Sequence, residues 1–387
     1  MLRQDNVARA LQLVHVFSGL SRAQLAVRLG VTRSTAKAIV AALSDGGLIV
    51  EEVQSTAGGR GRPSNVVEPA STSPVVFAIE LAVSHVTVAT VELGTRLTEI
   101  TRKQLSPSPT PAEVVALIGA VGRAHLRTVA RPVLGVGVSF YGAVRPGDGF
   151  VLHAPSLRWR DLPLGQLIGR ALGGQLPVSV GNDADLAVMA EARRWGGTQP
   201  QDLVYLIAEL GLGAGVVSGG SLLTGVNGAF GELGHMVVNP EGQRCPCGRR
   251  GCWETEVDGP GLLRHAGRTA TGNLSESVAA VLASVQAGDR RSRDGLTEYV
   301  RWLAIGLANV VNIFDPPRVV FGGILAQVLP AISDELSHAV TQAGLIRRSA
   351  PLSISAARLG EESALIGAAD LAFASLLSDP LGARASG

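Results

Sequence analysis

The stretches GELGH at residues 231–235 and CPCGRRGCWE at residues 245–254 contain the most specific pattern in the chain. The three cysteines of the sequence all lie in the second stretch, at positions 245, 247 and 252. Its glycines permit a tight backbone that can bring three thiolates onto one ion, and His235 supplies the fourth ligand of a closed tetrahedral shell. We therefore expect structural Zn²⁺, with no open position for catalysis, on His235, Cys245, Cys247 and Cys252. The alternative is a cluster of free, reduced cysteines.

An odd number of closely spaced cysteines argues against a disulfide framework and for a reducing compartment. The start of the chain, Met1-Leu2-Arg3-Gln4-Asp5, lacks the apolar core of a signal peptide. Apolar runs also stay short of the roughly 20 residues that a membrane helix needs. We expect a cytoplasmic protein with no membrane partner. A chain of 387 residues with 46% hydrophobic and 17% charged residues and 48 glycines is typical of a globular α/β protein of two or three domains.

The charge of the chain is uneven. Residues 1–65 contain eight Lys/Arg and four Asp/Glu, a net charge of +4, whereas the remaining 322 residues have a net charge of −2. A basic head on a nearly neutral body is typical of a protein that contacts a phosphate backbone through its head. A chance excess of arginine is the alternative.

The head follows a helical pattern in its first 50 residues. Ser21 can cap a helix that runs to Leu29, and Thr32 can cap a second helix that runs to Ser44. A short strand follows at 48–50. This pattern predicts a helix-turn-helix whose second helix enters the DNA major groove. The side chains expected to contact DNA from its first turn are Arg33, Ser34, Thr35 and Lys37. A small helical bundle without a DNA-binding role fits the same pattern.

A basic Gly-Arg repeat follows, as Gly59-Arg60-Gly61-Arg62-Pro63. Glycine allows a close backbone approach, and Pro63 favours extended geometry at Arg62. Two arginines on a thin extended segment suit a narrow minor groove, so we expect a wing in which Arg60 and Arg62 contact DNA. A flexible basic linker is the alternative. We assign residues 1–65 to a winged helix-turn-helix and residues 66–74 to a linker.

From residue 75 the pattern changes to short β-rich runs, later interleaved with helices. This order predicts an α/β body of two lobes with a cleft between them. We assign residues 75–184 to the first lobe, joined by a C-terminal helix at 361–377, and residues 185–360, with the cysteine motif, to the second. Asn182-Asp183 follows a predicted strand at the strand-to-helix turn.

With these motifs the chain resembles the ROK family of repressors, open reading frames and kinases, in its repressor branch. E-x-G-H stands as Glu232–His235 and C-x-C-G-x-x-G-C-x-E as Cys245–Glu254. The resemblance implies an actin-like, hexokinase-like (ribonuclease H-like) ATPase-type fold behind the winged helix-turn-helix, and zinc on the four ligands named above. It also implies a sugar site, with Asp183 the catalytic base in kinase members, made of Asn182, Asp183, Glu232, His235 and Glu254. Without the resemblance, the Asn-Asp pair also fits a helix cap, and the two glutamates fit solvated loop positions.

The phosphate motifs depart from those of kinase members. The D-x-G-x-T stretch is Glu80-Leu81-Ala82-Val83-Ser84, so Ala82 places a Cβ where bare backbone approaches phosphate. The G-T-G-x-G loop is Gly211–Gly215, where Leu212 has no hydroxyl to donate. Phosphoryl transfer depends on positioning and charge stabilisation. We therefore expect no enzyme activity, with Asp183 as a vestigial base.

The sugar site departs as well. Tyr141-Gly142 stands in place of a Pro-Gly turn, and Ser156 in place of an asparagine. The effector is therefore an unusual sugar or derivative, or sensing has been lost. We predict a sugar-responsive, repressing, DNA-binding homodimer or higher homo-oligomer. The alternatives are an ATP-dependent sugar kinase with a regulatory head, and a DNA-binding protein that responds to no ligand.

Overall fold

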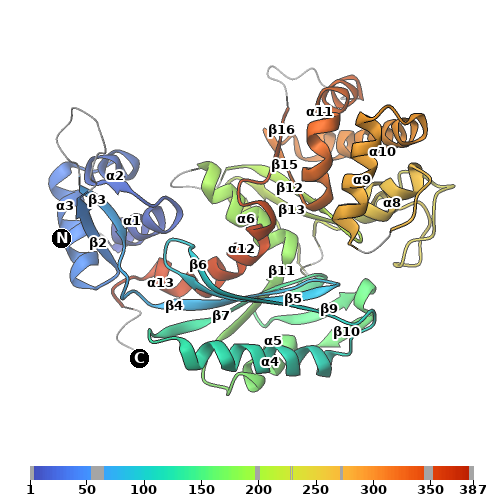
Figure 1. Cartoon of the computed structure of the whole chain (residues 1–387). Coiled ribbons are helices and arrows are strands. Elements are labelled where there is room, and N and C mark those ends of the chain that lie inside the picture. The colour runs from blue at the N-terminus through green and yellow to red at the C-terminus, as the bar shows by residue number, and fades with distance from the viewer. Residues whose placement is uncertain are drawn as a thin grey trace.

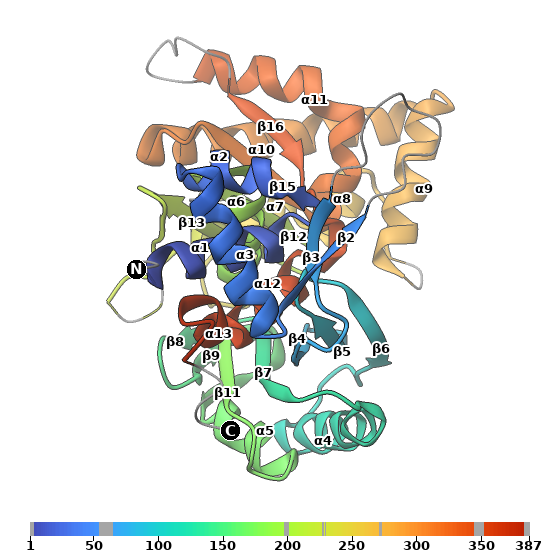
Figure 2. The same cartoon turned by 90° about the vertical axis from the view of Figure 1, so that its left-hand side faces the viewer.

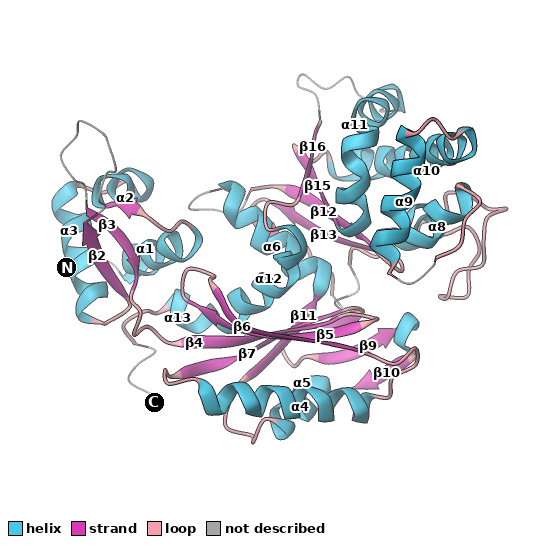
Figure 3. Cartoon of the chain, viewed as in Figure 1, coloured by secondary structure: helices cyan, strands magenta, loops and turns pink. Residues whose placement is uncertain are grey.

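The computed structural model describes residues 4–53, 65–196, 201–226, 228, 230–270, 273–343 and 352–382. These residues form a small N-terminal head and two larger α/β lobes (Figure 1). Head and lobes each combine helices with a sheet, as the colouring by secondary structure shows (Figure 3). None of the helices in the described ranges is both long and apolar enough to cross a membrane.

The head consists of three helices and a three-stranded antiparallel sheet. The helices are α1 (Gln4–Val16), α2 (Arg22–Leu29) and α3 (Arg33–Asp45), and the sheet has the order β1 (Leu20–Ser21), β3 (Asn65–Pro69), β2 (Ile49–Val53). The expected caps are present, because Ser21 accepts a hydrogen bond from the Gln24 backbone and Thr32 from that of Thr35. Gly30 ends α2 in the left-handed region, with φ of 68°. Helix α3 lies on the outer side of the head, away from the lobes (Figures 1 and 2).

The end of the head differs from the expected boundary. Residues 66–69, expected in the linker, belong to β3, the central strand of the head's sheet. Val67 is fully buried there and pairs with Leu20 on one side and Glu51 on the other. Burial of this apolar side chain is the physical reason that the sheet extends past residue 65. The predicted minor-groove residues Arg60 and Arg62 lie outside the described residues.

The first lobe is built on a mixed five-stranded sheet. Its strand order is β11 (Val178–Asn182), β7 (Val133–Phe140), β4 (Val75–Leu81), β5 (His85–Glu92), β6 (Leu97–Gln104). Helices α4 (Pro111–Thr128) and α5 (Leu164–Ala171) cover one face, and α12 (Ser363–Ala372) covers the other (Figure 1). Strand β4 has the nearly continuous apolar sequence VVFAIEL, as expected for a strand whose two faces are both covered by helices. A small sheet of β8 (Ala143–Arg145), β9 (Phe150–Ala154) and β10 (Trp159–Leu162), with the 3₁₀ turn η1 (Pro155–Leu157), lies beside it.

Within the described residues, the second lobe has a five-stranded sheet and five helices. Its order is β14 (Ser221–Leu222), β13 (Leu212–Ser218), β12 (Leu203–Ala208), β15 (Arg318–Gly322), β16 (Ser353–Ala356). The helices are α7 (Trp253–Val257), α8 (Gly259–His265), α9 (Leu274–Gln286), α10 (Arg290–Phe314) and α11 (Gly323–Ala343). The fully buried Trp253 fixes α7 against α10, where a Cβ at Gly306 would overlap the indole.

Two helices lie between the lobes. Helix α6 (Asp183–Gly196) begins at the end of β11 and packs against α12 and against β13 of the second lobe. The chain ends with η3 (Gly360–Glu362), α12 and α13 (Ala374–Ser378), so the closing helical segment expected at 361–377 is two helices. Helix α13 packs against α1 of the head (Figure 2), and Gln12 Nε2 donates a hydrogen bond to the Leu377 carbonyl at 3.0 Å.

Candidate ligand cleft and metal centre

A cleft of about 600 Å³ lies between the lobes. The first lobe contributes the turn after β7 and the residues around η1, and the second contributes the start of β13 and the cysteine loop. The cleft brings together all five residues expected in the sugar site, namely Asn182, Asp183, Glu232, His235 and Glu254.

Asn182 is held by the protein through both ends of its amide. Its Nδ2 donates to the Gly142 carbonyl at 3.0 Å, and its Oδ1 accepts from the Asp185 backbone at 3.0 Å. The second contact closes the first turn of α6, so the residue acts as a helix cap while lining the cleft. The remaining amide hydrogen and oxygen lone pair are the groups that Asn182 can offer to a ligand.

Acidic side chains crowd the start of α6. Burial raises the pKa of Asp183 to about 7; the Ala184 N–H opposes this rise, and the charges of Glu80, Asp185 and Glu209 add to it. Burial and the charge of Glu232 raise the pKa of Asp185 to about 7 as well. Near neutral pH each of these two carboxyls can therefore donate as well as accept hydrogen bonds.

His235 links the cleft to the cysteine loop. It lies in η2 (Leu233–His235), with Nε2 3.7 Å from Glu232 Oε2 and Nδ1 3.3 Å from Glu254 Oε1. Glu254 is buried in the first turn of α7, with Oε1 2.7 Å from the Cys245 sulfur. Burial raises the pKa of Glu232, and the charge of His235 opposes that rise. The loop that contains the cysteines, residues 245–252, thus helps to position two carboxylates: Glu232 through His235, and Glu254 through His235 and Cys245.

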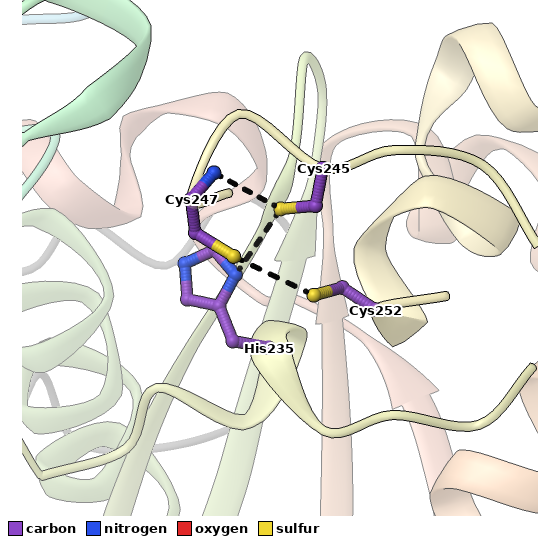
Figure 4. Close-up of side chains that lie close together, drawn as sticks. All are labelled: His235, Cys245, Cys247 and Cys252. Atoms are coloured by element: carbon purple, nitrogen blue, oxygen red, sulfur yellow. Dashed lines mark hydrogen bonds between the residues drawn. The ribbon is translucent and has the colours of Figure 1, made fainter. Parts of the chain in front are cut away.

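The four expected metal ligands converge on one point (Figure 4). Their ligand atoms all lie within 4.8 Å of one another. Both the His235 Nδ1 to Cys245 Sγ distance and the Cys247 to Cys252 Sγ distance are 3.6 Å. A tetrahedral Zn²⁺ with Zn–S bonds of about 2.3 Å separates its sulfur ligands by about 3.7 Å, so donor set and spacing fit this ion.

A left-handed glycine makes this arrangement possible. Gly251 has φ of 74°, and a Cβ there would overlap the Asn239 carbonyl. Only glycine therefore lets the loop pass close enough to place Cys252 beside Cys247.

Several residues around the cleft were not anticipated from the sequence. Asp258 caps α8 through the Gly261 N–H at 2.6 Å, and burial raises its pKa to about 7. His153 and Arg249 line the cleft. Arg249 lies inside the cysteine motif and Asp185 in the first turn after Asn182-Asp183, so both carried a sequence signal. No local sequence pattern pointed to His153 as a cleft residue, and it lies on β9 of the small sheet.

The residues that stand at the positions of the kinase phosphate motifs make contacts within the protein itself. Glu80 Oε2 lies 3.4 Å from His85 Nε2, and the Ala82 N–H donates to the His85 carbonyl at 3.1 Å. Leu212 is 6% exposed and packs in the core of the second lobe.

The residues expected to contact DNA from α3 lie on its first turn. Arg33, Ser34 and Lys37 are exposed, and Thr35 is half-buried. The Ser34 and Thr35 hydroxyls both lie 2.9 Å from the Thr32 hydroxyl at the helix start.

The sequence profile of the ROK family matches residues 76–375. The chain belongs to the ROK family. It is 30% identical to a glucokinase of Streptomyces coelicolor over 281 residues, which cover 68% of this chain and 88% of the glucokinase. It is 24% identical to a putative xylose repressor of Caldicellulosiruptor sp. over 396 residues, 98% of both chains.

A solved ROK family transcriptional regulator, described as a homologue of the Escherichia coli Mlc protein, has the same architecture. It superposes with a TM-score of 0.77 at 25% identity, over 99% of both chains. The family and the two-lobed sugar-kinase-like fold expected from the sequence are thereby confirmed.

Proposed function

We propose that this ROK protein is a transcriptional regulator that binds DNA through its head and releases or alters that binding when a sugar occupies the cleft. The observation that carries the proposal is a basic head, with an exposed helix on its outer side, packed on a sugar-kinase-like body. The relatives support the same assignment. The putative xylose repressor aligns with 98% of the chain, whereas the glucokinase aligns with 68%.

The head has the geometry that major-groove binding requires. Helices α2 and α3 are joined by a turn of three residues, Gly30–Thr32, and α3 faces outward (Figure 1). Its first turn exposes Arg33 and Lys37, which can donate to base edges or phosphates. Two heads reading paired half-sites require a dimer, so we also propose a homodimer.

The cleft has the donors and acceptors of a sugar site. Asp183, Glu232 and Glu254 come from three different segments and face one cavity with Asn182 and His235. We also propose that His235, Cys245, Cys247 and Cys252 hold Zn²⁺ with a closed ligand shell. Zn²⁺ would supply structural cross-linking there, and through His235 Nδ1 it would fix the imidazole whose Nε2 faces Glu232.

We propose further that the chain does not phosphorylate sugars, although the glucokinase relative makes a kinase the competing assignment. The Ala82 N–H is taken by the His85 carbonyl, and Leu212 replaces a hydroxyl donor with a buried apolar side chain. The absence of one preorganised donor typically costs about 3 kcal/mol of barrier stabilisation. ADP release measured with ATP and a panel of sugars should stay at background, and turnover near about 1 per second would establish the kinase instead.

Selection of bound duplexes from a random DNA library tests the DNA-binding half. The full chain should enrich a symmetric sequence. Changing Arg33 and Lys37 together to alanine should weaken binding to that sequence. The slope of log K against log salt should also fall, by about one for each phosphate that the variant no longer neutralises.

The matched control changes Arg127 and Lys103, an exposed arginine and lysine of the first lobe, to alanine. It should bind the selected duplex like the unaltered chain. Equal binding by the α3 variant and the control variant would refute the assignment of α3.

A further inference from the structure

The Tyr141-Gly142 turn is fixed at the first-lobe wall of the cleft. The Tyr141 N–H donates to the Leu81 carbonyl at 3.2 Å, and the Gly142 carbonyl accepts from Asn182. Gly142 has φ of 149°, and a Cβ there would lie 2.9 Å from the His153 carbonyl. The backbone therefore cannot shift easily, and the direction of the Tyr141 side chain is set.

The Tyr141 hydroxyl reaches across the cleft to the second lobe. A Cβ at Gly211 would overlap this hydroxyl and would lie 3.0 Å from Glu254 Oε2. Two polar groups from opposite lobes thus meet beside Gly211, in the loop that corresponds to a phosphate loop. The negative charge that acts most strongly on the hydroxyl is that of Asp183, followed by Glu254.

Ser156 completes the arrangement. Its hydroxyl shares a hydrogen bond with the Tyr141 hydroxyl. These two residues are the departures from the family pattern at the sugar site, and in the folded chain they form one contact. Burial raises the pKa of Tyr141, and the neighbouring carboxylates raise it further, so the phenol keeps its proton and remains a donor.

The position of this hydroxyl bears on the size of the ligand. In a kinase the general base lies within hydrogen-bond reach of the hydroxyl that receives the phosphate. In a hexose kinase of the glucokinase type that hydroxyl is on the exocyclic CH₂OH group, which therefore points to the base and to the phosphate loop. In this chain the corresponding aspartate is Asp183, which lines the same cleft as Tyr141, and the phenol hydroxyl of Tyr141 lies beside Gly211 of the corresponding phosphate loop.

We propose that Tyr141 is a specificity-determining residue that makes the cleft select a pentopyranose, with the phenol hydroxyl in the place of the hexose CH₂OH group. The proposal rests on the proposed function, because it concerns the sugar in the same cleft. A hexose must displace a side chain that is anchored through Ser156 and enclosed by both lobes. A pentopyranose leaves the phenol in place and gains it as a hydrogen-bonding partner.

D-xylose and D-glucose provide a matched pair of probes, because they differ only in the CH₂OH group at C5. Calorimetric titration of the full chain should give D-xylose an affinity at least about tenfold higher, since one excluded carbon group is worth about 10- to 200-fold. Tyr141→Ala should bring the two affinities within about threefold by opening the space. Tyr141→Phe should keep the exclusion of glucose and weaken D-xylose about fivefold, the usual worth of one hydrogen bond.

Ile100→Ala is the control, because Ile100 is an exposed apolar residue on β6, outside the cleft, and its replacement should leave the preference for xylose unchanged. Two outcomes overturn this proposal alone. One is that the unaltered chain binds D-glucose more tightly than D-xylose. The other is that Tyr141→Ala keeps the preference for D-xylose while its melting temperature is unchanged. Binding of neither sugar overturns it together with the sugar-sensing half of the proposed function. DNA selection is measured separately and decides the other half.

Discussion

Single residues around the cleft are held in protonation states that they would not have in water. Asp183 and Asp185 are two positions apart, and burial raises both pKa values to about 7. In an unfolded chain an aspartate has a pKa of about 3.9. As the pH rises from about 4 to about 7, the unfolded chain therefore loses protons that the folded chain still binds. The free energy of unfolding falls over that interval because of these groups.

Replacing one of these carboxyls should remove its contribution to the pH dependence of the free energy of unfolding. Asp183→Asn keeps the shape and the hydrogen-bonding groups, but it cannot ionise. Its melting temperature relative to the unaltered chain should therefore be higher at about pH 8 than at about pH 5, as measured by differential scanning calorimetry in both buffers. A difference in melting temperature that is the same at the two pH values would show that Asp183 does not titrate in this interval.

At the scale of elements, the loop between η2 and α7 has little regular backbone pairing of its own. Its described backbone pairing consists of the isolated bridges Val237 to Cys252 and Arg244 to Arg250, together with a few turn hydrogen bonds. The side chains of Glu232 and Glu254 at its two ends line the cleft. A metal that cross-links this loop would therefore stabilise the fold and shape the cleft.

Metal analysis of the purified chain should give about one zinc ion per chain. Cys247→Ser removes one ligand, so it should lower both the zinc content and the melting temperature, because the binding energy of a structural ion is coupled to folding. Arg244→Ala changes an exposed side chain of the same loop and should change neither quantity. If Cys247→Ser retained full zinc content and stability, the proposed ligand set would be wrong.

Local pattern explains which elements the sequence predicted. The four expected metal ligands lie within 18 residues, between His235 and Cys252, so their short spacing in the sequence was enough to predict that they converge. The starts of α2 and α3 were predicted from single capping residues. By contrast, the approach of Tyr141 to Gly211 depends on how the two lobes pack against each other, and nothing in the local sequence encodes it. The strand at 66–69 was missed because both of its partner strands, β1 and β2, lie before the predicted wing in the sequence.

At the scale of the whole molecule, a buried hydrogen bond joins the head to the body. His15 of α1 is fully buried, with Nε2 2.9 Å from Asp370 Oδ1 in α12, and its Nδ1 accepts from the Gly94 N–H at 3.1 Å. Because Nδ1 accepts and Nε2 faces the carboxylate, the ring is the Nε2–H tautomer. Asp370 Oδ2 also accepts from Arg193 of α6 at 2.9 Å. Helix α6 thus runs from the cleft, at Asp183, to the contact that holds the head.

The carboxylate at the centre of this contact is strongly stabilised. Burial by itself would raise the pKa of Asp370, but the hydrogen bond from His15 and the charges of Arg194 and Arg193 hold the pKa well below its usual range. Since the folded pKa is depressed, this stabilisation is present above the unfolded pKa and is lost as the pH falls through the folded pKa. At neutral pH the contact is therefore fully formed.

Removing Asp370 should be costly, because it leaves the buried Arg194 and the half-buried Arg193 without a counter-charge. Asp370→Ala should lower the free energy of unfolding by about 3–5 kcal/mol, the usual cost of breaking a buried pair. His15→Ala should let the head unfold before the body, giving two transitions in a calorimetric scan where the unaltered chain gives one. His338→Ala removes an exposed histidine of α11 and should leave a single transition. A single transition at the original temperature for His15→Ala would contradict this role.

We propose that a sugar in the cleft and DNA held by the head are coupled within one chain. The dissociation constant of the full chain for its selected duplex, measured by fluorescence anisotropy with and without saturating D-xylose, tests this coupling. We predict a change of at least about tenfold, within the usual range of coupling between sites. We also predict that Asp183→Asn binds the duplex equally well in both conditions. A dissociation constant for the unaltered chain that D-xylose leaves unchanged, although the sugar binds, would contradict the claim.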